Sequence, residues 1–130
     1  MGSLVTLDSF DHTGVVVKDA EATAESWTQK LGAGPWRFTD AGALKLAHAQ
    51  VGGIQYELLE PLEDQSLWAK FLAAQGEGLH HICHMVADVD DAVEKLKADG
   101  GTVMIAIPKA MAYVEIGGPG SVIIELLKTR

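Results

Sequence analysis

An internal repeat runs through the chain, and it limits the fold to two copies of one structural unit. When the sequence is shifted against itself by 69 positions (81 − 12), residues of the first half coincide with identical residues of the second. The coinciding pairs are His12 with His81, Val17 with Val86, Asp19 with Asp88, Glu25 with Glu94 and Gly32 with Gly101. At a shift of 68 positions (125 − 57), Glu57 meets Glu125. Each half therefore opens with a histidine and closes with a glutamate.

Both halves predict the same order of elements. In the first half, a β-branched run at residues 10–17 predicts a strand, and Asp19 before an alanine-rich segment that ends at Gly32 predicts a capped helix. Antiparallel strands are expected at 36–39, 43–50 and 54–60. In the second half we expect a strand at 80–87, a helix at 88–99, and strands at 102–107, 112–116 and 121–128. The predicted fold class is α+β, with two βαβββ units.

The 130 residues are expected to form a single domain, because no linker, charge block or low-complexity segment interrupts them. Unit one covers about 5–61 and unit two about 79–130. Between them, residues 62–78 form a connector with a short predicted helix at 66–75. An apolar fraction of 48% argues against disorder, and the chain is long enough to bury a core.

Charge and composition exclude several classes of partner. A formal net charge of -8 argues against nucleic-acid binding, which needs a basic face. No apolar run approaches the roughly 20 residues that span a bilayer, so we expect no membrane association. The single cysteine, Cys83, cannot form an internal disulfide. These features favour a cytoplasmic protein.

Two glutamates lie in apolar strands, where an uncompensated carboxylate is costly. Glu125 is flanked by isoleucines and leucines, and Glu57 has a similar setting. A lone histidine or glutamate in a strand is more often hydrogen-bonded or solvated than a ligand. The repetition of the pair favours a shared divalent metal site instead, with His12, Glu57, His81 and Glu125 as ligands.

These residues carry a resemblance to the vicinal oxygen chelate superfamily, which includes glyoxalases, bleomycin-resistance proteins, extradiol dioxygenases and methylmalonyl-CoA epimerases. The resemblance covers nearly the whole chain and is strongest at residues 11–17 (DHTGVVV), 56–62 (YELLEPL), 69–72 (AKFL), 76–82 (GEGLHHI) and 122–126 (VIIEL). The middle three segments look most like methylmalonyl-CoA epimerase. The resemblance implies a glyoxalase-like open-barrel cleft, the four metal ligands named above and a homodimer.

Two segments depart from the epimerase pattern. Residues 109–118 lack the Gly-Ala-His-Gly-like loop that covers coenzyme A in that family, and 44–48 lack a glutamate proposed as a base in some epimerases. Glu57 stands where many epimerases have glutamine. These departures leave the catalytic base open.

Three residues are candidates for proton transfer. Glu115 lies ten positions before Glu125 across a hairpin, where a carboxylate is expected to face the metal. Glu125 itself is a second candidate, by resemblance, and His48 is a third. A solvent-facing role is the alternative for Glu115 and His48. His80 and His84 are expected to point away from the metal, and Cys83 to be buried and unreactive.

The leading functional hypothesis is a metal-dependent isomerase or epimerase, similar to methylmalonyl-CoA epimerase. It would remove a proton next to a carbonyl through a metal-stabilised enolate, with an acyl-CoA or related small carbonyl compound as substrate. The alternatives are a glyoxalase-type lyase, another metal-dependent enzyme of the superfamily, or a non-catalytic drug-binding resistance protein. Mixed histidine and carboxylate ligation suits cobalt, nickel, manganese, iron or zinc.

Overall fold

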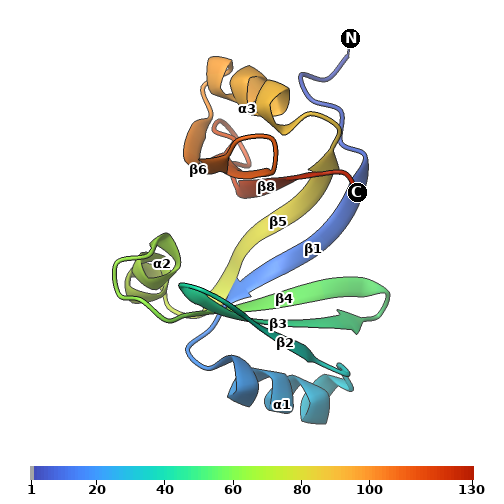
Figure 1. Ribbon diagram of the computed structural model, residues 1–130, viewed down its shortest axis with the longest axis vertical. Helices are drawn as coiled ribbons and strands as arrows, with labels where there is room; N and C mark the ends of the chain where they lie inside the picture. The colour runs from blue at the N-terminus through green and yellow to red at the C-terminus, as the bar shows by residue number, and fades with distance from the viewer. Residues whose placement is uncertain (1) are drawn as a thin grey trace. The chain divides into compact units, whose positions relative to one another are not determined.

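The computed structural model describes residues 2–130, and in these it has three helices and eight strands (Figure 1). The order is β1 (Ser9–Val16), α1 (Ala20–Leu31), β2 (Arg37–Ala41), β3 (Leu44–Val51), β4 (Ile54–Pro61), α2 (Leu67–Gln75), β5 (Gly78–Val86), α3 (Val89–Ala98), β6 (Thr102–Ile107), β7 (Met111–Glu115) and β8 (Ile123–Lys128). The predicted α+β class and the two βαβββ units are confirmed. None of the three described helices is long and apolar enough to cross a membrane.

The chain packs as two compact units whose boundaries fall inside strands. The N-terminal unit is His12–His80, and the C-terminal unit joins the residues up to Asp11 with His81–Arg130. Within the C-terminal unit, the Asp8 backbone N–H donates to the Met85 carbonyl oxygen at 2.9 Å, and Arg130 lies 3.3 Å from the Asp11 carboxylate. The residues before His12 therefore pack with the second half of the sequence.

In the N-terminal unit the strand order is β2-β3-β4-β1, with β1 parallel to β4 and the other pairs antiparallel. Helix α1 covers one face of these strands (Figure 1). The buried residues of that face are Val15, Val17, Ala20, Ala24, Ala47 and Leu58. Because side chains alternate along a strand, the odd residues of β1 and the even residues of β4 face α1. His12 and Glu57 consequently lie on the other face.

The same face that carries His12 and Glu57 is covered in part by α2. A second apolar cluster there is formed by Val16, Leu44 and Leu59, with Leu46, Trp68, Phe71 and Leu72 packed against it. The connector helix that the sequence predicts is thus an integral part of the N-terminal unit. It begins with the hydroxyl of Ser66, which accepts from the Ala69 N–H at 3.1 Å.

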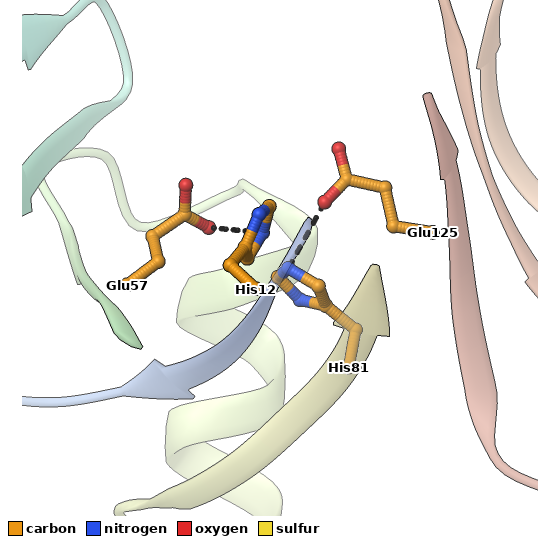
Figure 2. Close-up of side chains that lie close together, drawn as sticks. All are labelled: His12, Glu57, His81 and Glu125. Carbon is orange, nitrogen blue, oxygen red and sulfur yellow. Dashed lines mark ion pairs between the residues drawn. The ribbon is translucent and has the colours of Figure 1, made fainter. Parts of the chain in front are cut away.

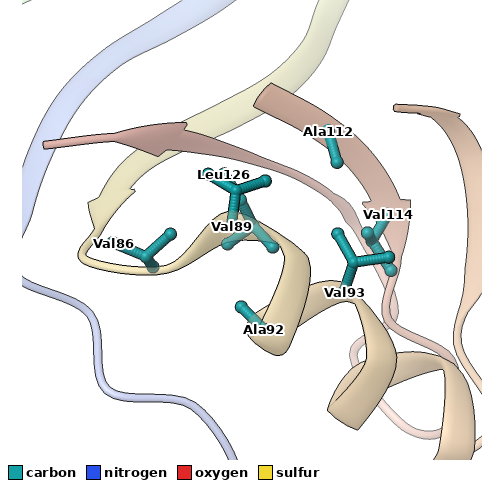
Figure 3. Packing of buried hydrophobic residues seen from close by; sticks show 7 residues of the cluster. All are labelled: Val86, Val89, Ala92, Val93, Ala112, Val114 and Leu126. Atoms are coloured by element: carbon teal, nitrogen blue, oxygen red, sulfur yellow. The ribbon is translucent and has the colours of Figure 1, made fainter. Parts of the chain in front are cut away.

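In the C-terminal unit the strand order is β5-β8-β7-β6, with β5 parallel to β8. Figure 3 shows the core between α3 and these strands, formed by Val86, Val89, Ala92, Val93, Ala112, Val114 and Leu126. By alternation, His81 and Glu125 lie on the face turned away from α3. Each unit therefore holds one histidine and one glutamate on the sheet face opposite its own covering helix.

The helix ends explain why some repeated residues coincide. Asp19 and Asp88 are the N-caps of α1 and α3, and each carboxylate accepts a backbone N–H at 3.0 Å. Gly32 and Gly101 coincide for different reasons. Gly32 ends α1 in the left-handed conformation, with φ of 68°. Gly101 instead lies so close to the helix that a Cβ would come within 2.8 Å of the Leu96 carbonyl oxygen.

Candidate functional site

Three strands of the N-terminal unit bring together His12 of β1, His48 of β3 and Glu57 of β4, which we call the N-terminal cluster. The Nε2 atom of His12 lies 3.3 Å from Oε1 of Glu57, and the Nε2 atom of His48 lies 2.9 Å from Oε2. The two imidazoles thus engage different oxygens of one carboxylate. Figure 2 shows Glu57 facing His12.

Strand register produces the N-terminal cluster directly. In the antiparallel pair of β3 and β4, His48 is the partner of Glu57, so their side chains project side by side from one face. In the parallel pair of β1 and β4, Glu57 is opposite Gly14, two residues beyond His12 on the same face. Gly14 has no side chain to separate the Glu57 carboxylate from the His12 ring.

The C-terminal cluster consists of His81 of β5, Glu125 of β8 and Tyr113 of β7. The Nε2 atom of His81 lies 3.1 Å from Oε1 of Glu125, as Figure 2 shows. Tyr113 is the cross-strand partner of Glu125, and its ring centroid lies 4.8 Å from that of His81 at an interplanar angle of 34°. Cys83 is opposite Glu125 in the parallel pair of β5 and β8.

Burial of the two glutamate carboxylates costs free energy unless their lost hydration is compensated. Glu57 is 8% exposed and Glu125 7% exposed, and His12 and His81 are buried as well. A buried carboxylate needs hydrogen-bond donors or a cation to offset its desolvation. Each of the four residues offers one ligand atom, either an imidazole nitrogen or a carboxylate oxygen. This donor chemistry fits a first-row divalent metal ion, for which mixed nitrogen and oxygen ligation is common.

The structure distinguishes among the three predicted catalytic residues. Glu125 lies in the C-terminal cluster, and His48 is a half-buried member of the N-terminal cluster, where a solvated position was the alternative. Glu115 is exposed at the end of β7, opposite Ile123. The expectation that Glu115 occupies the position across the hairpin from Glu125 is wrong, because Tyr113 occupies it.

Tyr113 is the residue of the C-terminal cluster that the sequence analysis missed. The signal that identifies it is the register of the last hairpin, which pairs Tyr113 with Glu125 across the loop between β7 and β8. A pairing separation of 12 positions (125 − 113), in place of ten, moves the facing residue from a carboxylate to an aromatic ring.

The remaining histidines of β5 alternate with His81. His80 is buried, and its ring meets that of Phe71 of α2 edge-on at 4.9 Å within the N-terminal unit. His84 meets Phe10 in the same manner at 5.6 Å within the C-terminal unit. The expected alternation agrees with these contacts, although His80 is a packing residue and not a solvent-facing one. Cys83 is buried, as expected.

Comparison with known proteins identifies one family. The model of the Glyoxalase/Bleomycin resistance protein/Dioxygenase superfamily matches residues 11–116 of the chain. This match spans β1 to the end of β7 and includes His12, His48, Glu57 and His81, while Glu125 lies beyond it.

Curated relatives and solved structures agree with this match. The chain is 34% identical over 98 residues to the ethylmalonyl-CoA/methylmalonyl-CoA epimerase of Cereibacter sphaeroides, covering 72% of each chain. It is 30% identical to the mitochondrial methylmalonyl-CoA epimerase of Homo sapiens, covering 96% of this chain and 69% of that one. A variant of the Streptomyces coelicolor methylmalonyl-CoA epimerase in complex with 2-nitronate-propionyl-CoA has a TM-score of 0.79 at 25% identity, covering 95% of this chain and 99% of that one.

Proposed function

Since the chain belongs to the Glyoxalase/Bleomycin resistance protein/Dioxygenase superfamily, we propose that it is a metal-dependent epimerase or isomerase acting on an acyl-CoA thioester. The observation that carries this proposal is the buried histidine and glutamate pair, which occurs once in each compact unit. The relatives named as methylmalonyl-CoA epimerases support the substrate class. The proposed reaction removes the proton next to the thioester carbonyl and returns it.

We propose that His12, Glu57, His81 and Glu125 together hold one divalent metal ion. The support is their repetition in the sequence, their burial and their ligand chemistry. When bound, such an ion supplies a Lewis acid that polarises the carbonyl oxygen of the substrate. Cobalt, nickel, manganese, iron and zinc all suit this donor set.

The chain's own residues must move the proton. Glu125, His48 and Glu115 are the proposed candidates, and a positioned base contributes about 100- to 10,000-fold to such a reaction. Glu125 is favoured because it lies in a buried cluster, whereas the Nε2 atom of His48 is engaged by the Glu57 carboxylate at 2.9 Å. Glu115 is exposed, and its cross-strand partner is Ile123, outside both clusters. Its carboxylate would therefore exchange protons readily with solvent.

Hydrogen exchange at the substrate carbon tests the proposed function. In deuterated water, the metal-loaded protein is expected to introduce deuterium at the α-carbon of methylmalonyl-CoA or ethylmalonyl-CoA, measured by mass spectrometry. The same protein treated with chelator should fall to the rate of buffer alone, and metal should restore exchange. An absence of metal-dependent exchange across a panel of acyl-CoA thioesters would reject the proposal. It would favour a glyoxalase-type lyase or a drug-binding resistance protein.

We further propose that the protein is a cytoplasmic homodimer. The family resemblance implies the dimer, and the single buried cysteine suits a reducing compartment. Strand β6 ends the strand order of the C-terminal unit and exposes Met104 and Ile107. An exposed apolar edge strand is commonly covered by another chain.

Sedimentation equilibrium is expected to give twice the monomer mass, and a monomer at micromolar concentration would contradict the dimer.

A further inference from the structure

We propose that His48 is a positioning residue that fixes the orientation of the Glu57 carboxylate for metal binding. This inference rests on the proposed function, because it assigns Glu57 as a ligand. The supporting contact is the hydrogen bond between Nε2 of His48 and Oε2 of Glu57, at 2.9 Å between two largely buried side chains. Outer-shell hydrogen bonds of this kind orient the ligands of metal sites.

His48 acts on the ligand and is not itself in the ligand set. His12 lies beside Oε1 of Glu57, whereas His48 bonds Oε2. The proposed ligand set contains His12 and Glu57 of the N-terminal unit but not His48. The bond to His48 therefore occupies one oxygen and leaves the other, on the His12 side, as the ligand atom. A carboxylate held in this way would present its Oε1 atom to a metal ion.

The hydrogen bond also determines which nitrogen of the His48 imidazole carries the proton. As a metal ligand the Glu57 carboxylate would be ionised and could only accept, and Nε2 of His48 would then carry the proton that it donates to Glu57. The other nitrogen, Nδ1, is buried and has no hydrogen-bond partner among residues 2–130. Glu57 thus sets the orientation of the His48 ring as well.

The equivalent position in the other unit is used differently. His48 and Tyr113 are each the cross-strand partner of a glutamate, Glu57 and Glu125 respectively. Tyr113 stacks on the ring of His81 at 4.8 Å. His48 instead bonds the carboxylate of Glu57. The cross-strand residue thus contacts the histidine in the C-terminal cluster and the glutamate in the N-terminal cluster. The two halves of the repeat therefore differ in how their cross-strand residue contacts the proposed ligands.

Metal titration of the metal-free protein tests this role without any assay of activity. Chelator-treated wild type, His48→Leu and His48→Gln are titrated with cobalt(II) by calorimetry. His48→Leu removes the donor and is expected to weaken cobalt binding about 10- to 100-fold. His48→Gln keeps an N–H donor of comparable reach and is expected to recover most of that loss. His84→Leu is the matched control, because it removes a half-buried histidine of another strand, β5, that contacts Phe10, and it should bind cobalt like wild type.

The outcomes separate the two proposals. If wild type binds no cobalt, the proposed metal-dependent function fails and the role of His48 fails with it. If wild type binds but His48→Leu binds equally well, or His48→Gln is as weak as His48→Leu, only the positioning role is overturned. Circular dichroism of the metal-free variants checks folding. If His48→Leu does not fold, His48→Asn takes its place, because its shorter amide cannot reach Glu57 and should bind cobalt as weakly as predicted for the leucine variant.

Discussion

Replacing Glu125 with alanine is expected to abolish the thermal stabilisation that a divalent metal ion gives the wild-type protein. Binding to the folded state alone adds about 4 kcal/mol of stability when the free metal is a thousandfold above its dissociation constant. For a chain of this length that corresponds to a rise in melting temperature of roughly 10 to 20 °C. Loss of Glu125 removes a negatively charged ligand that is 7% exposed, and it leaves His81 without the carboxylate 3.1 Å away.

The measurement is differential scanning calorimetry of each variant with chelator and then with cobalt or manganese. Glu115→Ala is the matched control, because it removes a glutamate from the neighbouring strand at an exposed position. It should keep the full metal-dependent rise in melting temperature. A full rise in Glu125→Ala would contradict the assignment of Glu125 as a ligand, while loss of the rise in Glu115→Ala would mean that Glu115 also contributes to metal binding.

Replacing Leu58 with alanine is expected to lower the free energy of unfolding by about 2 to 5 kcal/mol, the usual cost of truncating a fully buried leucine. Leu58 is 0% exposed and packs with Val15, Val17 and Ala47 under α1. It directly follows Glu57 in β4 and points to the opposite face of the strand. The cavity would therefore open behind the N-terminal cluster and not within it.

Urea denaturation followed by circular dichroism gives this free energy. Leu31→Ala, at the exposed last residue of α1, is the matched control and should cost less than about 0.5 kcal/mol, since Leu31 is 62% exposed. A loss below 1 kcal/mol in Leu58→Ala would mean that the strands and α1 close around the cavity. Such a result would contradict the close packing of Leu58 beneath α1.

Local patterns predicted the elements and the burial of the two glutamates well, because each rests on short-range physics. Asp19 and Gly32 mark the ends of α1 by capping, and the helix runs from Ala20 to Leu31 as expected. Strand alternation placed His81 on the face opposite His84. The glutamates were identified because a carboxylate in an apolar strand is buried at a cost, and both are buried.

Not every register and partner across strands could be predicted in the same way. The offset between β7 and β8 depends on how the intervening loop closes, so no local pattern distinguishes Tyr113 from Glu115 as the partner of Glu125. The register of β3 and β4, by contrast, follows from the two-residue turn at Gly52 and Gly53, which pairs Val51 with Ile54, so the pairing of His48 with Glu57 was within reach of the sequence. His80 is buried because α2 supplies Phe71, a contact between separate elements.

The division of the chain inside β1 has a consequence for folding during synthesis. The segment before His12 packs with the segment that follows His80, as the bonds from Asp8 to Met85 and from Arg130 to Asp11 show. The stretch His12–His80 can collapse on its own while the ribosome is still translating. The segment before His12 finds its partners only after the residues that follow His80 have been synthesised. Its contacts are therefore among the most distant in sequence, and contacts of this kind slow folding.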